Sequence, residues 1–363
     1  MKRILTATLT ATLVAVMLAM GGWSAGVMAA SSPAGAPLKV ALVLAQGGLG
    51  DLSYNDLAYK GLEKAAKDFA GRVTVRTIQS ADIVSQAEQV LRSTGQLGFD
   101  LVIDLEFSSA DALARVAPNY PKTHFAIFNT IVNKPNATSV MFQEQEGSFL
   151  AGALAAMVTS NPSIPGINAD RTIGVIGGTK SLGIDKFIVG YIEGARYVDP
   201  KIKVLVSYSN TFGDPGKGKQ MAQAMFEQGA DIVYQVAGGT GQGVIEAAKA
   251  SGHYAIGVDT DQDYLAPGAV LTSMIKRADV AVYTLIQREL VRRGGGGDVV
   301  TLGLAQGAIG LSPMTYTRNR IPKEYLTKLE AIKQGILAGS IKVDDITKAK
   351  DPSAIEARLG LGK

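Results

Sequence analysis

The sequence predicts an α/β protein of two lobes, each a mostly parallel sheet flanked by helices. Nearly continuous apolar runs of strand length alternate with amphipathic helical patterns, which is typical of parallel sheets covered on both faces. The chain has 363 residues, of which 47% are hydrophobic, so it can bury two cores of ordinary size. The alternation stops once, near residues 129–136, and then restarts with its own set of strands. We therefore expect the chain to cross from one lobe to the other at this break.

Residues 1–29 have the features of a signal peptide. Lys2 and Arg3 give a positive start, residues 4–20 are apolar apart from threonines, and residues 27–30 form a small-residue cleavage pattern. Cleavage near Ala29 would release a soluble, exported chain, whereas the alternative is an uncleaved membrane anchor. The sequence contains no cysteine, which excludes disulfides, thiolate catalysis and a lipidated N-terminal cysteine.

From residue 38 onward the expected strands and helices follow one another in a regular order. The strands are expected at 40–44, 73–77, 101–104, 124–128, 172–176, 204–207, 232–236 and 254–258. The helices between them are expected at 57–69, 85–97, 110–120, 149–158, 187–197, 218–228 and 244–250. Shorter strands at 271–274 and 299–303 and helices at 280–292 and 322–338 complete the pattern.

These elements lead to a division of the chain into lobes. We expect the first lobe to contain residues 37–131 and about 265–297, and the second to contain 132–264 and about 298–340. The polar segment 341–363 is expected to be a loosely held tail.

The composition argues against several classes of function. Without Lys2 and Arg3, 34 basic residues remain against 32 acidic ones, so there is no electrostatic footprint for nucleic acid. His124 and His253 are the only histidines and both lie next to strands, which disfavours a histidine metal site or an acid–base pair. The glycine-rich run 238–243 has neither dinucleotide-binding nor P-loop spacing. We therefore expect no metal, no cofactor and no catalytic residues.

In open α/β sheets, ligands bind beyond the carboxyl ends of the strands. The corresponding loops here are 47–55, 104–109, 129, 177–182, 210–214, 238–243 and 259–264. Two lobes that present such edges to each other form a cleft, which is a common site for a small molecule.

Six segments resemble the basic membrane protein family of ABC-transporter substrate-binding proteins, in which the best understood members are purine nucleoside receptors. They are G-D-L-S-Y-N at 50–55 with G-L at 61–62, E-Q-E-G-S-F-L-A-G at 144–152, D-P-G-K-G-K at 214–219, A-G-G-T-G-Q-G-V at 237–244, I-G-V-D-T-D-Q at 256–262 and T-S-M-I-K-R at 272–277. The resemblance implies a two-lobed, type I-like periplasmic binding protein that closes on its ligand.

The resemblance also implies a function. The protein would be a monomeric periplasmic receptor that delivers a purine nucleoside or related heterocycle to a membrane permease with a separate ATPase, and it would not be an enzyme. Two alternatives remain open: an exported nucleoside hydrolase that uses Asp51, Asp104 and Asp259 as carboxylates, and a sensory binding protein that presents its closed form to a receptor.

The resemblance implies that five residues contact the base or the sugar of the ligand. Tyr54 would stack on the purine, with Phe212 as its partner on the other lobe. Asp259 and Lys276 would hold the ribose hydroxyls, and Gly238 would let the backbone approach the sugar.

Three further polar residues complete the expected site. Asp51 and Asn55 would contact the ligand or the loop that holds Tyr54, although both also lie where helix-capping groups are expected. Asn129 stands where the nucleoside receptors have an aspartate that contacts the base. Because an amide donates as well as accepts, the hydrogen-bond pattern toward the base edge could invert.

Overall fold

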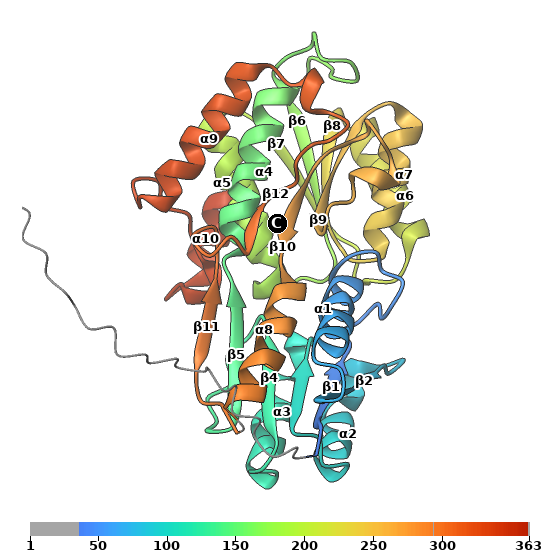
Figure 1. Ribbon diagram of the computed structural model, residues 1–363. Coiled ribbons are helices and arrows are strands. Elements are labelled where there is room, and N and C mark those ends of the chain that lie inside the picture. Colours follow the sequence, from blue (N-terminus) through green and yellow to red (C-terminus); the bar gives the residue numbers. More distant parts are fainter. Residues whose placement is uncertain (1–35, 293, 362–363) are drawn as a thin grey trace, which may run out of the picture. The chain divides into compact units, whose positions relative to one another are not determined.

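The computed structural model describes residues 36–292 and 294–361, so the expected signal peptide lies outside the described residues. In these ranges twelve strands form two six-stranded sheets, and each sheet carries helices on its faces (Figure 1). Within the same ranges, no helix is both long enough and apolar enough to cross a bilayer. The predicted fold class, two mostly parallel sheets flanked by helices, is confirmed.

The first sheet is entirely parallel and has the strand order β11-β5-β4-β3-β1-β2. Its strands are β1 (Leu38–Val43), β2 (Val73–Ile78), β3 (Leu101–Asp104), β4 (His124–Phe128), β5 (Ala137–Phe142) and β11 (Val299–Leu302). Its helices are α1 (Tyr54–Asp68), α2 (Ile83–Gln96), α3 (Ala110–Val116) and α8 (Ala278–Val291), with the short helices η1 (Phe107–Ser109) and η2 (Ala117–Asn119).

Strand β1 shows why the strands of this sheet read as continuous apolar runs. Val40 and Leu42 join the core that includes residues of α1 and α8, whereas Ala41 and Val43 join the core that includes residues of α2 and α3. Because successive side chains point to opposite faces and both faces are covered, the positions from Val40 to Val43 are all apolar, whereas Lys39 near the start of the strand is exposed.

The second sheet has the order β12-β10-β9-β8-β6-β7, and only the β10–β12 pair is antiparallel. Its strands are β6 (Thr172–Gly177), β7 (Lys203–Tyr208), β8 (Ala230–Val236), β9 (Tyr254–Asp259), β10 (Val270–Lys276) and β12 (Ile309–Leu311). Its helices are α4 (Glu144–Thr159), α5 (Leu182–Val198), α6 (Pro215–Glu227), α7 (Thr240–Ser251), α9 (Lys323–Leu337) and α10 (Pro352–Leu359), with η3 (Asp263–Leu265), η4 (Arg318–Arg320) and η5 (Ile346–Lys348).

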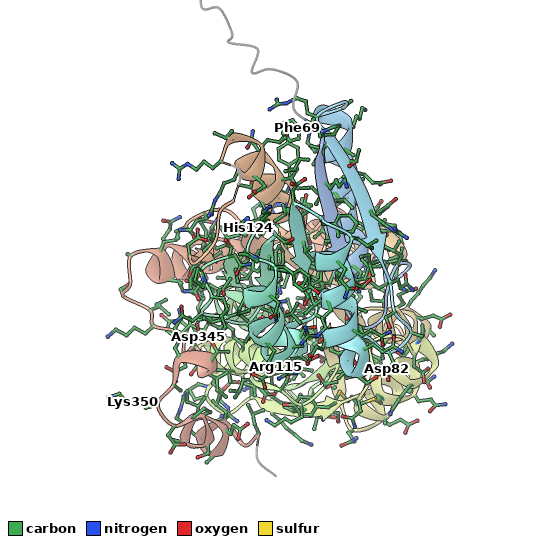
Figure 2. All side chains as sticks on the ribbon, turned by 90° about the horizontal axis from the view of Figure 1, so that it is seen from below. Phe69, Asp82, Arg115, His124, Asp345 and Lys350 are labelled. Atoms are coloured by element: carbon green, nitrogen blue, oxygen red, sulfur yellow. The ribbon has the colours of Figure 1, made fainter. Side chains whose placement is uncertain are left out.

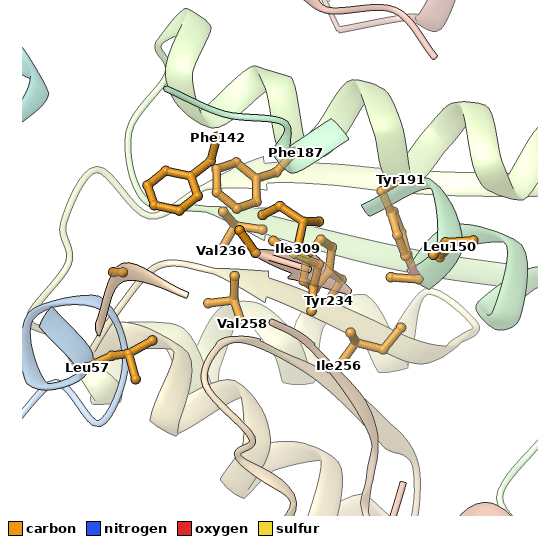
Figure 3. Close-up of a cluster of buried hydrophobic side chains, with 14 of the residues drawn as sticks. Leu57, Phe142, Leu150, Phe187, Tyr191, Tyr234, Val236, Ile256, Val258 and Ile309 are labelled. Atoms are coloured by element: carbon orange, nitrogen blue, oxygen red, sulfur yellow. The ribbon is translucent and has the colours of Figure 1, made fainter. Parts of the chain in front are cut away.

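Helices α4 and α5 pack unusually closely because glycines face each other's backbone. A Cβ on Gly152 of α4 would lie 1.9 Å from the carbonyl oxygen of Tyr191, and a Cβ on Gly194 of α5 would lie 1.9 Å from that of Phe149. Tyr191 of α5 packs against Tyr234 of β8, with ring centroids 5.1 Å apart and ring planes tilted by 43° (Figure 3). The close approach contributes to the burial of α4 on almost all sides, and its residues 149–158 are accordingly all apolar.

The chain crosses between the lobes three times, after β5, after β10 and after β11. The expected boundaries at 131/132 and 264/265 come one strand too early, because β5 pairs with β4 in the first sheet and β10 pairs with β9 in the second. Strand β11, expected in the second lobe, pairs with β5 in the first. The break at 129–136 is a connection within the first sheet.

The C-terminal segment also differs from the expected loose tail. It contains η5 and α10, and it is attached to α5 by ion pairs. Arg358 lies 2.6 Å from Glu193, and Asp345 lies 3.5 Å from the buried Lys186 (Figure 2 labels Asp345). The polar composition of residues 341–363 predicts a solvated tail, but its charged side chains form ion pairs with α5 of the second lobe instead.

Candidate functional site

A cleft with about 660 Å³ of atom-free space, partly open to solvent, lies between the two lobes. All eight residues selected from the sequence line it: Asp51, Tyr54, Asn55, Asn129, Phe212, Gly238, Asp259 and Lys276. Most follow the carboxyl ends of strands in one sheet or the other, where the strand-end rule placed the site. Eleven further residues share the lining: Ala45, Gln46, Leu105, Glu106, Phe107, Glu144, Gly183, Ile184, Phe187, Val236 and Val258.

Asp51 and Asn55 shape the loop that carries Tyr54 into the cleft. The Asp51 carboxylate accepts hydrogen bonds from the backbone N–H groups of Ser53 and Asn55, both at 2.9 Å. The Asn55 side-chain oxygen accepts from the N–H of Ala45 at 2.9 Å, which joins the end of β1 to the start of α1. Burial raises the pKa of Asp51, while these hydrogen bonds oppose the shift. Asp51 therefore accepts from N–H groups in the first turn of α1, as a capping group does, whereas Asn55 lies within α1 and binds the end of β1; both residues also line the cleft.

Asn129 connects Tyr54 to Lys276. Its amide nitrogen donates to the Tyr54 hydroxyl at 3.0 Å, and its oxygen accepts from the Lys276 ammonium at 2.8 Å. The Tyr54 hydroxyl donates to the carbonyl of Leu105 at 3.3 Å. Burial, followed by the negative charge of Asp259, raises the pKa of Tyr54 well above its usual value, so the phenol stays neutral. Both ends of the Asn129 amide thus have partners within the protein.

A buried group of charges, which we call the hinge charge cluster, consists of Glu144, Lys186 and Lys276. Glu144 begins α4 directly after the first crossing and lies 2.8 Å from Lys276 and 3.2 Å from Lys186. Lys186 also donates to the carbonyl of Phe142. Burial on its own raises the pKa of Glu144, but the two ammonium groups outweigh it and leave the pKa lowered. Glu144 belongs to the segment 144–152 that resembles the family, but no local pattern indicates its ion pairs with α5 and β10, which are distant in the chain.

Asp259 joins the two lobes across the cleft. Its carboxylate accepts a hydrogen bond from the Ser53 hydroxyl of the first lobe at 2.6 Å. Burial raises the pKa of Asp259 to about 6, although the Lys276 ammonium opposes the shift. The side-chain amide of Gln262 donates to the carbonyl of Leu52 at 2.9 Å and adds a second bond between the lobes. The structure is therefore a closed arrangement of the two lobes.

The second lobe contributes an apolar wall that the sequence did not single out. Ile184 and Phe187 of α5 line the cleft, and the ammonium of Lys276 lies 5.3 Å from the centre of the Phe187 ring. Both residues lie in the first two turns of α5, the helix that follows β6. The same strand-end signal that indicated the loop 177–182 could have found them.

The carboxylates proposed for hydrolysis do not converge in the cleft. Asp51 and Asp259 line it, but Asp104 does not. Asp104 is buried, and burial together with the neighbouring Glu106 charge raises its pKa to about 7. Glu106 does line the cleft, and its two oxygens accept hydrogen bonds from the Ser108 hydroxyl at 2.6 Å and from the backbone N–H of Gln46 at 3.1 Å. In the part of the chain that the structure describes, no group of three metal-ligating side chains is present.

Comparison with known proteins places this geometry in a family. Residues 38–347 match the family described as "ABC transporter substrate-binding protein PnrA-like". The chain is 33% identical to the CD4+ T-cell-stimulating antigen of Listeria monocytogenes over 332 residues, which cover 84% of this chain and 88% of the relative. It is 34% identical to the ABC transporter nucleoside-binding protein BmpA of Lactococcus lactis over 293 residues, 76% of this chain and 81% of the relative.

A solved structure gives the same result for the fold. The chain is similar to an ABC transporter solute-binding protein from Aeropyrum pernix, with a TM-score of 0.80 and 29% sequence identity. The similarity covers 90% of this chain and 98% of the other.

Proposed function

The chain belongs to the family of PnrA-like ABC transporter substrate-binding proteins, and from this premise we propose that it binds a purine nucleoside or a related flat heterocycle in the cleft between its lobes. The L. lactis relative, named as a nucleoside-binding protein, supports this ligand class.

One observation carries the proposal. Tyr54 of the first lobe and Phe212 of the second line the same cleft as the buried Asp259 and Lys276. Aromatic rings offer flat faces on which a base stacks. A carboxylate accepts hydrogen bonds from sugar hydroxyls, and an ammonium donates to them. The cleft thus combines what a base and a ribose each require, and Asn129 acts by holding Tyr54 and Lys276 in position.

The proposed role in transport follows from family membership. The protein would act in the periplasm as a monomer and pass its ligand to a membrane permease whose ATPase is a separate subunit. We propose that it is exported, cleaved near Ala29 and not lipidated, since the sequence has no cysteine to which a lipid could be attached. Mass spectrometry of the periplasmic protein should give an N-terminus near Ala30, and an intact Met1 would contradict this assignment.

A ligand screen tests the binding proposal directly. Inosine, guanosine, adenosine, cytidine, hypoxanthine and ribose are compared by thermal shift, because a ligand that binds only the folded state raises the melting temperature by mass action. Purine nucleosides should give the largest shifts, and Phe212→Ala should reduce them. Shifts with ribose alone, and none with any nucleoside or base, would contradict the proposal. Chromatography of the same mixtures should show intact nucleoside, whereas release of free base would favour the hydrolase alternative.

A further inference from the structure

Phe212 occupies the space that a side chain on Gly178 would need. Gly178 directly follows β6, and its added Cβ would lie 2.1 Å from Cε1, 2.4 Å from Cζ and 2.6 Å from Cδ1 of the Phe212 ring. These separations are far shorter than carbon atoms tolerate. Gly178 does not itself line the cleft, but Phe212 does.

The backbone at position 178 does not by itself require glycine. Gly178 is not among the glycines with a left-handed φ, whereas Gly238 on the neighbouring strand end has φ +53°. The N–H of Gly178 donates to the carbonyl of Val236 at 2.9 Å, which fixes this backbone beside β8. The contact with the Phe212 ring is therefore the reason why position 178 needs a residue without a side chain.

The loop that carries Phe212 is also fixed in place. The carbonyl of Phe212 accepts a hydrogen bond from the N–H of Thr240 at 3.3 Å, and the Ser209 hydroxyl donates to the carbonyl of Thr211 at 2.8 Å. On the other lobe, a Cβ on Gly47 would lie 3.1 Å from the Phe212 carbonyl oxygen, so the backbone of the first lobe closes over this loop. A ring pushed away from position 178 therefore has to move by rotation of the side chain, and because Phe212 lines the cleft, this rotation changes the surface that the ring presents there.

We propose that Gly178 is a positioning residue for ligand binding. The missing side chain at position 178 sets how far the Phe212 ring extends into the cleft, and thereby the thickness of the flat ligand that fits against it. This inference rests on the proposed function, in which a heterocycle stacks on Phe212.

A double-mutant cycle separates this role from a general structural one. Gly178→Ala should weaken inosine binding about 10-fold or more, because stacking on an aromatic ring is worth that much and the ring is displaced. In a Phe212→Ala background, Gly178→Ala should cause no further loss. Gly310→Ala is the matched control, since its Cβ would meet no atom within 4 Å and Gly310 lies outside the cleft lining. Equal losses in both backgrounds, or no loss in the first, would overturn the proposal.

A second readout needs no ligand. The sequence has a single tryptophan, Trp23, which lies in the proposed signal peptide, so in the mature chain that begins near Ala30 the Phe212→Trp substitution introduces the sole indole. Adding Gly178→Ala should shift its emission to longer wavelength and increase quenching by acrylamide, while Gly310→Ala should leave both unchanged. If inosine fails to bind the parent protein, the proposed function fails, and this emission shift still tests the positioning. An emission spectrum unchanged by Gly178→Ala would overturn the proposed positioning role of Gly178.

Discussion

Replacing Lys276 by methionine should expose the energetic role of the hinge charge cluster. Lys276 lies 2.8 Å from Glu144, donates to Asn129 at 2.8 Å and places its ammonium 4.9 Å from the centre of the Tyr54 ring. Methionine keeps the length and the apolar stem of lysine but removes the charge and the donors. The side chain of Glu144 is only 3% exposed, and after the substitution its remaining ion-pair partner would be the Lys186 ammonium, 3.2 Å from the carboxylate.

The size of the effect follows from the burial. Removing one partner of a buried ion pair typically costs about 3–5 kcal/mol, because an uncompensated charge remains. Since Lys186 still compensates part of the Glu144 charge, we expect Lys276→Met to lower the free energy of unfolding by about 3 kcal/mol at pH 7. Adding Glu144→Gln should recover part of this loss, because the double variant no longer buries the unpaired carboxylate.

The pH dependence gives an independent check. In the parent, the folded-state pKa of Glu144 is below the unfolded value, so its ionised form stabilises the fold above the unfolded pKa, and this contribution is lost as the pH falls through the folded pKa. Without Lys276, burial should raise that pKa, so the stability gap between parent and variant should narrow from pH 7 to pH 4.

Urea unfolding followed by circular dichroism measures all of these quantities. Lys64→Met is the matched control, because Lys64 pairs with Asp68 at the surface with its side chain 63% exposed, and it should leave the unfolding midpoint unchanged. A Lys276→Met protein as stable as the parent at pH 7, or a double variant no more stable than Lys276→Met, would refute the reasoning.

Substitutions at three further positions test the cleft and the packing. Asp259→Asn should weaken inosine binding by about 2–4 kcal/mol in calorimetry, because a charge-assisted hydrogen bond is lost. In the parent, binding should weaken as the pH falls through about 6, where Asp259 takes up its proton, and a parent profile as flat as that of the variant would contradict this. Tyr54→Phe should be mild, whereas Tyr54→Ala should cost about 1–3 kcal/mol of binding, since only the first keeps the ring; equal losses would exclude stacking. Gly152→Ala should lower the melting temperature far more than Gly310→Ala, because the added Cβ at position 152 would lie 1.9 Å from the Tyr191 carbonyl oxygen. Similar melting temperatures for the two variants would show that α4 and α5 can move apart at little cost in stability.

The sequence by itself determined the fold class, the family and the positions that meet in the cleft. Continuous apolar strands between amphipathic helices are typical of parallel sheets that are covered on both faces, and such sheets gather the residues after their strands at one edge. The strand-end rule placed the cleft at these loops, whereas the resemblance to the family selected the individual residues, including Tyr54, Phe212 and Lys276, and all of them line the cleft.

Only the tertiary structure decided which strand belongs to which sheet and which groups touch. The local sequence of β5, β10 and β11 does not encode the strand with which each pairs, so the sheet to which each belongs depends on the tertiary structure. For the same reason, the ion pairs of Glu144 and the contact between Gly178 and Phe212 became visible only in three dimensions. Each joins segments that are far apart in the chain, and distances through space follow from the packing of whole elements rather than from the residues on either side.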